Sequence, residues 1–379
     1  MSGPVKTSHN HHFAYIDALR GYAILAVMAV HASQLSPMWN EGIGRSLINQ
    51  GARGVQLFFV ASALTLMMSW HSRNDGVLNF YIRRLFRIAP MFWLAIVLFL
   101  GLNGFQPRFF APNGIDELTV LSTALFIHGW HPEHINSLVD GGWSIAAEMT
   151  FYAVFPLMAL LIRGLKASLL ALFLSGIASY YLFKLLWQMR IFIWPEISNA
   201  LVDNYLNLWF PNQLPVFLVG FVLFFANIRF KEKLSLLTLR VILVISILLM
   251  ILMGLLKNPY GILNGKLSLY LAYGICFGLF GFALANGASS RLINRPIVAL
   301  GKISFSAYIW HLVLIGCIWR FGHSFTEFTQ AIFGKDFLYF TFFFPCLVIS
   351  TAILSTITYR LIEQPGIWLG NRLIKRIGS

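Results

Sequence analysis

Apolar runs of roughly twenty residues recur along almost the whole chain, and they constrain the fold more than any other feature. A helix rises about 1.5 Å per residue, so about 20 residues cross the hydrocarbon core of a bilayer. The chain is 58% hydrophobic and only 11% charged, whereas soluble domains are about 25% charged. The sequence therefore predicts an all-α, polytopic integral membrane protein with no separate soluble domain.

The hydropathy pattern divides the chain into a short N-terminal tail (1–13), a transmembrane domain (14–358) and a basic C-terminal tail (359–379). The first apolar run lacks a small-residue cleavage site after it, so we expect it to be retained as a span. Ten spans are predicted: 14–33, 54–70, 89–105, 143–162, 167–187, 209–228, 236–256, 267–286, 299–319 and 337–358.

Lysine and arginine set the expected orientation. With the N-terminus inside, the inner segments hold about twice as many of them as the outer ones, as the positive-inside rule requires. Both termini are therefore predicted to be cytoplasmic. The net charge of +14 is explained by these loops, so no nucleic-acid partner is expected. The apolar stretch within 116–130 is short for a span, and we expect it to stay outside, as a re-entrant or interfacial segment.

Three ionisable residues lie on the first span. At 100° per residue, Asp17, Arg20 and His31 project from one sector of about 60°, and His31 lies about 16 Å beyond Arg20 along the axis. Each such group is costly in lipid unless it finds a partner or water. The alternative is an Asp17–Arg20 pair with a histidine bonded to the backbone. A polar path through the bundle is the favoured interpretation.

Arg83, Arg84 and Arg87 form a second cluster within a 100° arc at the inner end of the third span. Guanidinium groups offer paired donors that suit phosphate. The alternative is ordinary anchoring to lipid headgroups. Tyr81 and Phe86 lie in the same stretch, where they would flank a nucleotide-like ligand.

Ser144 and Glu148 share one face of the fourth span. They are equally consistent with a functional pair, in which Ser144, Arg53 or an inner histidine donates to Glu148, and with the cap and first turn of a helix. Three further features carry weaker signals. These are the stretch from Ser304 to His311, the histidines His128, His131 and His134, and the aromatic pair Trp130 and Trp143. Pro132 and the lack of a matching carboxylate argue against a metal site, and the tryptophans suit sugar stacking.

At these positions the chain resembles the acyltransferase-3 family of bacterial membrane enzymes. The family marks are an arginine, ten residues and a histidine (Arg20 to His31), F-F-V-x-S (Phe58 to Ser62), R-R-x-x-R-I-x-P (Arg83 to Pro90), W-S-x-x-x-E-x-x-F-Y (Trp143 to Tyr152), S-x-S-x-Y-x-x-H (Ser304 to His311) and I-E-x-P (Ile362 to Pro365). They follow the family's order over nearly the whole chain. Ala63 replaces the family's usual glycine, which puts only local close packing in doubt.

The resemblance implies an O-acyltransferase of the bacterial inner membrane that moves an acyl group, by default acetyl, from acetyl-CoA to a glycan or glycolipid such as lipopolysaccharide. No metal is implied. The expected catalytic residues are His31 as general base, Arg20, Asp17 and Glu148; Glu148 would either bind the acceptor or orient His31. The expected donor-binding residues are Arg83, Arg84, Arg87, Tyr81 and Ser62, and the expected acceptor-binding residues are Trp143, Ser144, Trp130, His311 and Tyr308.

Some relatives carry an additional extracytoplasmic domain. The short basic tail after the last span predicts a stand-alone enzyme that acylates its acceptor directly or passes the group to a separate extracytoplasmic transferase. The rival hypothesis is a proton-coupled exporter that uses Asp17, His31 and Glu148 as a relay. It calls for two halves with matching hydropathy, and the sequence has no such repeat.

Overall fold

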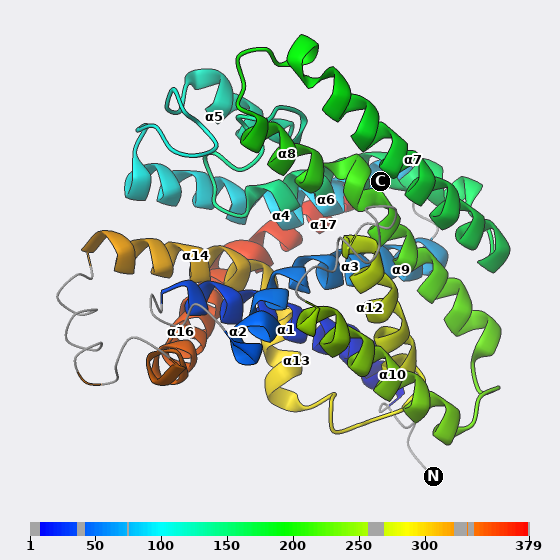
Figure 1. Ribbon diagram of the computed structural model, residues 1–379. Coiled ribbons are helices and arrows are strands. Elements are labelled where there is room, and N and C mark those ends of the chain that lie inside the picture. The colour runs from blue at the N-terminus through cyan, green and yellow to red at the C-terminus, as the bar shows by residue number, and fades with distance from the viewer. Residues whose placement is uncertain are drawn as a thin grey trace.

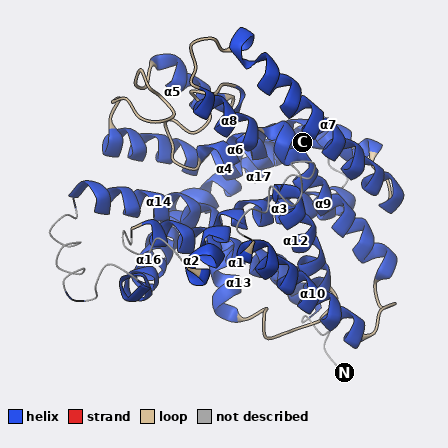
Figure 2. Cartoon of the chain, viewed as in Figure 1, coloured by secondary structure: helices blue, strands red, loops and turns tan. Residues whose placement is uncertain are grey.

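The computed structural model describes residues 8–35, 42–73, 76–256, 269–321, 332 and 337–377, and the regular elements in those ranges are helices (Figure 2). Within them, nine helical segments are long and apolar enough to cross a membrane, and one shorter apolar helix, α12 (Leu269–Ala285), has 17 residues. Each predicted span coincides with one of these ten. The prediction of an all-α polytopic membrane protein is confirmed.

The helices longer than one turn have the following bounds: α1 (Ser8–Gln34), α2 (Ile43–Asn49), α3 (Gly54–Ser72), α4 (Gly76–Asn103), α5 (Glu117–Ala124), α6 (Gly142–Leu161), α7 (Leu165–Ile193), α8 (Asn199–Leu208), α9 (Phe210–Phe230), α10 (Leu236–Leu255), α12, α13 (Arg295–Lys302), α14 (Ser304–Phe321), α16 (Phe337–Thr358) and α17 (Gln364–Ile377). Residues 1–7 of the predicted N-terminal tail and the start of the predicted span 267–286 lie outside the described residues.

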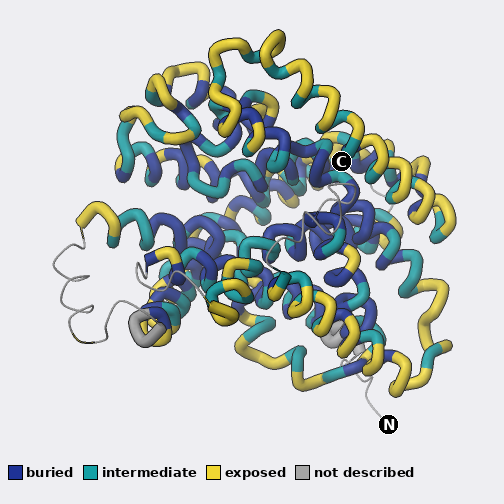
Figure 3. The backbone as a smooth tube through the Cα atoms, viewed as in Figure 1, coloured by how far each residue is buried: buried dark blue, intermediate teal, exposed yellow. Residues whose placement is uncertain are grey.

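The centre of the bundle is formed by α1 and α3, while α7 lies at its periphery beside α9 (Figures 1 and 3). In the most apolar window of the segment Ile43–Ser72, 72% of residues are buried, against 6% in α7. A helix that is surrounded by other helices has no face in contact with lipid. For this reason α1 and α3 can place polar side chains such as Arg20 and Ser62 inside the bundle.

Glycine brings α1 and α13 into backbone contact. A Cβ atom added at Gly301 would lie 1.7 Å from the Asp17 carbonyl oxygen, and one at Gly21 would lie 2.2 Å from the Ile297 carbonyl oxygen. Small residues allow such close approach between membrane helices. The half of α1 that carries Asp17 and Arg20 is therefore fixed against α13.

A glycine also decides the packing of α3 against α9. Ala63, which stands where the resemblance leads one to expect glycine, lies against Gly220, and a Cβ atom at Gly220 would be 2.6 Å from the Ala63 Cβ and 2.7 Å from the Val60 carbonyl oxygen. The close packing that the alanine put in doubt is thus kept, because the partner helix supplies the glycine.

We expect Gly220→Ala to lower the free energy of unfolding by about 1–3 kcal/mol, since an added methyl group overpacks this contact. Thermal unfolding of the detergent-solubilised protein measures the change. Adding Ala63→Gly should recover part of it, because the contact with Val60 remains. Gly176, where the nearest atom to an added Cβ lies at 3.5 Å, provides the matched control. Equal unfolding temperatures for Gly220→Ala and Gly176→Ala would contradict this account.

The segment between α4 and α6 is folded without a crossing. Asp116 caps α5 by accepting hydrogen bonds from the Thr119 backbone N–H at 2.7 Å and from its hydroxyl at 2.5 Å, which holds the pKa of the Asp116 carboxyl below its usual range. With 8 residues, α5 is too short to span a bilayer. This agrees with the prediction that 116–130 does not cross.

The predicted C-terminal tail is helical. A π-helical turn, η3 (Tyr359–Glu363), joins α16 to α17, and α17 packs on α4 through two glycines. A Cβ atom at Gly366 would lie 2.6 Å from the Phe86 carbonyl oxygen, and one at Gly370 would lie 2.8 Å from the Phe86 Cβ. The tail therefore packs against the helix that carries the arginine cluster.

Candidate active site

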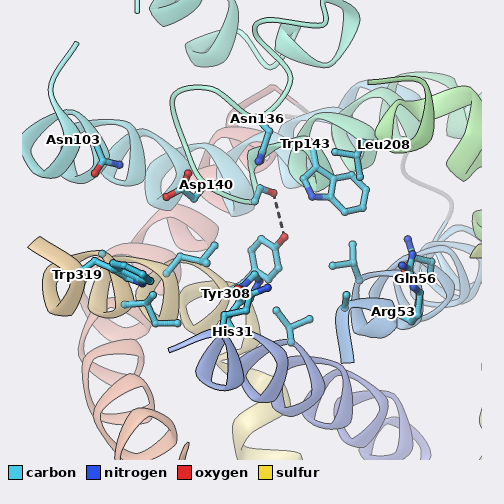
Figure 4. Close-up of a pocket in the computed structure, with 18 of the residues that line it drawn as sticks. His31, Arg53, Gln56, Asn103, Asn136, Asp140, Trp143, Leu208, Tyr308 and Trp319 are labelled. Carbon is cyan, nitrogen blue, oxygen red and sulfur yellow. Dashed lines mark hydrogen bonds between the residues drawn. The ribbon is translucent and has the colours of Figure 1, made fainter. Parts of the chain in front are cut away.

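A large cavity of about 740 Å³ opens where the C-terminal end of α1 meets the start of α6. Its volume lies within the range of small-molecule sites, about 300–1,000 Å³. Figure 4 shows His31 and Tyr308 on one side of it, Asn136, Asp140 and Trp143 on the opposite side, and Trp319, Gln56 and Arg53 toward its ends. These residues come from α1, the 3-10 turn η1 (Gln50–Arg53), α3, the loop before α6, the start of α6, and α14.

His31 is the ionisable residue of α1 that lines this cavity. Its Nδ1 lies 3.0 Å from Oε1 of Gln34, and an amide oxygen only accepts hydrogen bonds. Nδ1 therefore carries the proton, and Nε2 of the neutral ring is left with its lone pair. The His31 ring lies 5.4 Å from the ring of His311, which is fully buried and donates from Nδ1 to the Ala307 carbonyl oxygen at 3.0 Å.

A second, narrower cavity of about 70 Å³ lies deeper in the bundle and is lined by Arg20, Arg87, Ser62, Glu148 and Tyr152, among others. The Glu148 carboxylate accepts hydrogen bonds from Ser62 at 2.6 Å and from Tyr152 at 2.5 Å. Among the described residues the donors to Glu148 are thus Ser62 and Tyr152, whereas the predicted donors Ser144, Arg53 and a histidine do not bond it. Glu148 shares the narrow cavity with Arg20, whereas His31 lies in the large cavity.

Arg20 donates to the Thr65 hydroxyl at 3.1 Å. The i, i+3 spacing predicts a pair with Asp17, but no ion pair within 4.0 Å joins these two described residues; the charges of Asp17, Glu148 and Arg87 nevertheless act on the guanidinium. Thr65 lies one turn beyond Ser62 on α3. Arg20 is therefore oriented by α3 rather than by its own helix.

Tyr308 separates the two cavities, since it and Val55 line both. Its hydroxyl accepts a hydrogen bond from Ser144 at 3.0 Å and donates to the Gly141 carbonyl oxygen at 3.2 Å. Gly141 has a φ of +76°, and a Cβ atom there would lie 2.8 Å from the Tyr308 hydroxyl. Glycine at 141 thus allows both the backbone turn and the contact. Ser144 is committed to this contact and does not cap α6, because the N-cap is Gly141.

The three clustered arginines differ in placement. Arg87 lines the narrow cavity, whereas Arg84 has its guanidinium 5.8 Å from the Phe80 ring centroid and 5.9 Å from that of Tyr152. Neither Arg83 nor Arg84 lines a described cavity. Tyr81 is exposed and donates to the Ala153 carbonyl oxygen at 2.7 Å. The structure therefore brings Arg87 to Arg20 and leaves Tyr81 at the outer surface of α4.

The two tryptophans also separate. Trp143 lines the large cavity and meets Phe59 edge to face at 6.0 Å, whereas Trp130 is half-exposed and packs on Trp209 outside it. His128 is buried, and its Nε2 donates to the Gly142 carbonyl oxygen at 3.1 Å; burial lowers the pKa of His128 to about 4. His128 supports the start of α6, and the described residues contain no group of three or more His, Cys, Asp and Glu side chains able to hold a metal.

The last two motifs form one structural unit. Glu363, which is buried in η3, accepts hydrogen bonds from the Ser306 backbone N–H at 3.1 Å and from the Ser306 hydroxyl. This carboxylate holds the first turn of α14, one turn before Tyr308 and His311. The I-E-x-P motif therefore acts on the site through the position of α14.

Sequence reasoning missed several residues that line the large cavity: Gln34, Gln56, Asn136 and Asp140. Gln34 follows His31 at i, i+3, and this spacing was the one available signal. The other three lie at a helix start or in a loop, where periodicity says nothing about orientation.

The fold and the site together define a multi-pass membrane protein in which ionisable groups from distant spans gather around two adjoining cavities. A family model described as "Acyltransferase domain" matches residues 13–360, and the chain belongs to this acyltransferase family. It is a membrane acyltransferase, as the motifs indicated.

Three curated relatives show how far this similarity extends. The chain is 27% identical over 338 residues to acyltransferase MdmB of Streptomyces mycarofaciens, covering 81% of this chain and 79% of that protein. It is 25% identical over 282 residues to the exopolysaccharide production protein ExoZ of Rhizobium meliloti, covering 72% and 79%. It is 26% identical over 384 residues to O-acetyltransferase OatA of Staphylococcus aureus, covering 92% of this chain but 56% of that protein. No solved structure matches the chain significantly.

Proposed function

We propose that this membrane acyltransferase moves an acetyl group from cytoplasmic acetyl-CoA to a hydroxyl of a glycan or glycolipid outside the bacterial inner membrane, with both of its termini in the cytoplasm. The observation that carries the proposal is the pair of adjoining cavities. One is lined by Arg20 and Arg87, the other by His31, and Tyr308 lies between them. Such a path lets a donor and an acceptor from opposite sides of the membrane meet inside the bundle.

The residues at the inner end fit the donor. Coenzyme A carries phosphate groups, and arginine binds phosphate through planar, paired donors. Arg87 faces the narrow cavity, with Arg83 and Arg84 on the same helix, and Ser62 adds a hydroxyl beside Arg20. The donor supplies a thioester carbonyl. The chain's residues bind its anionic end and guide its arm toward Tyr308, whose side chain has to move to connect the cavities.

His31 would act as the general base. Its Nε2 would take the proton from the acceptor hydroxyl as the oxygen attacks the thioester carbonyl carbon. The C–O bond forms, the C–S bond breaks, and the proton passes from the imidazolium to the leaving thiolate. A neutral histidine suits this role near pH 7, and Gln34 holds the tautomer that leaves Nε2 free.

Glu148 and Asp17 serve the donor side of this scheme. Glu148 balances the positive charge of Arg20 and Arg87 and fixes Ser62 and Tyr152. Asp17 adds a second negative charge near Arg20 without bonding it. One relative is named for exopolysaccharide production, which supports a polysaccharide acceptor, and another is named an O-acetyltransferase, which supports acetyl transfer to a hydroxyl.

The test is the release of free thiol from acetyl-CoA by the purified protein, with and without crude periplasmic glycan. Release that increases with glycan is expected. No release with acetyl-CoA or with other acyl-CoAs would contradict the proposal and favour a proton-coupled exporter. A variant of the mechanism forms an acyl-enzyme on a serine, a tyrosine or His31, and radiolabelled acetyl trapped on the protein in the absence of glycan would identify it.

A further inference from the structure

We propose that Asp140, Asn136 and Gln56 recognise the acceptor through its hydroxyl groups, so that the large cavity takes a hydroxyl-rich sugar. This inference rests on the proposed function, because it takes the molecule bound in the large cavity to be the acceptor of the acyl group. None of the three residues belongs to a motif of the family resemblance.

The cavity contains more hydrogen-bond acceptors than the protein satisfies. Within the described part of the chain, Oε1 of Gln56 and Oδ1 of Asn136 are buried without a hydrogen-bond partner, and the Asp140 carboxylate receives no hydrogen bond from a described residue. All three residues line the large cavity. Buried polar atoms are nearly always paired, so two buried, unpaired oxygens beside the Asp140 carboxylate call for a ligand that donates. Nε of Arg53 in the same lining is buried without a hydrogen-bond partner among the described residues as well and calls for an acceptor. A sugar hydroxyl both donates and accepts, and so satisfies both kinds of group.

Gln56 is held so that its oxygen stays unpaired. Its amide Nε2 donates to Oε1 of Gln213 at 3.0 Å, and Gln213 in turn donates to the Asn207 carbonyl oxygen at 2.8 Å. The chain of donors runs away from the cavity through α9. The orientation of Gln56 is therefore set by the protein before any ligand binds.

The loop that carries Asn136 and Asp140 is fixed as well. Arg108 donates to the carbonyl oxygens of Ser137 at 3.3 Å and Gly104 at 2.6 Å, which ties this loop to the end of α4. Burial raises the pKa of the Asp140 carboxyl, and the Arg108 charge opposes that rise. Preorganised acceptors of this kind bind hydroxyl groups with little loss of side-chain entropy.

The remaining lining fits a sugar ring. Trp143 and Trp319 line the cavity on either side of Asp140 in Figure 4 and supply apolar surfaces. The Arg53 guanidinium lies 4.6 Å from the centre of the Tyr270 ring. Arg320 lines the cavity too, so the lining carries two arginines and one carboxylate.

The experiment measures sugar binding without the donor. The protein is reconstituted in nanodiscs, because maltoside detergents would compete, and tryptophan fluorescence is titrated with the neutral trisaccharides maltotriose and cellotriose. Wild type should bind at least one of them. Asp140→Asn should weaken neutral binding about tenfold, since a hydrogen bond to a charged group contributes about 1.5–3 kcal/mol. Asp203→Asn, an exposed carboxylate on α8, is the control and should bind as wild type does.

No binding of either trisaccharide by wild type, or an Asp140→Asn variant that binds like wild type, would overturn the inference. The thiol-release assay separates it from the proposed function. Release of thiol without sugar binding would leave the acyltransferase proposal intact. Asp140-dependent binding in a protein that releases no thiol would leave the sugar site intact.

Discussion

His31→Ala is expected to lower the rate of acetyl transfer by about 10² to 10⁴-fold, the contribution of a well-placed general base. The ring faces the large cavity, and Gln34 fixes its tautomer. Alanine removes the only neutral nitrogen in the scheme that takes the acceptor proton. Thiol release from acetyl-CoA in the presence of glycan measures the loss, with binding of the donor followed separately.

The matched control is His71→Ala. His71 lies at the C-terminal end of α3, where its Nδ1 donates to the Met67 carbonyl oxygen at 2.9 Å. It lines neither of the two adjoining cavities. The His71→Ala variant should transfer acetyl groups at close to the wild-type rate. A folded His31→Ala protein that transfers as fast as His71→Ala would end the general-base assignment, whatever the donor proves to be.

Arg87→Ala is expected to raise the apparent KM for acetyl-CoA about 10- to 100-fold, because a hydrogen bond to a charged group contributes about 1.5–3 kcal/mol. Arg87 is the member of the arginine cluster that lines the narrow cavity with Arg20. The rate at saturating donor should change much less, since Arg87 lies away from His31. Initial rates over a range of acetyl-CoA concentrations separate the two effects.

Arg240→Ala serves as the control for overall charge, since Arg240 is exposed on α10. An equal rise of KM in both variants would show that general electrostatic attraction, and not a phosphate site, accounts for the effect. Arg84→Ala should give a smaller rise than Arg87→Ala, because its guanidinium lies over the rings of Phe80 and Tyr152.

Much of the fold follows from the sequence because lipid leaves few choices. A long apolar run must become a helix, and so each predicted span was found. Helix geometry also placed Arg20 and His31 on one side of α1. It did not reveal that Tyr308 from α14 would separate them, or that Thr65 from α3 would replace Asp17 as the partner of Arg20. Those facts depend on which helices become neighbours.

The acceptor side was less accessible to sequence reasoning. Asp140 and Asn136 lie in a loop whose path is set by Arg108, and Gln56 owes its orientation to Gln213 on a distant helix. Polar residues in loops are ordinarily solvated, so they carry no pattern. Trp130 was predicted to join this site and does not line it, because it packs against Trp209 instead.

The contact between Glu363 and Ser306 has a consequence for biosynthesis. The first turn of α14, from which Tyr308 and His311 project, depends on a carboxylate that the ribosome adds 57 positions later. Until residue 363 has been synthesised and η3 has packed, Tyr308 is not held in the position that separates the two cavities. The candidate active site is therefore completed only after α16 has been inserted and η3 has packed, so we expect a chain interrupted before that point to be inactive.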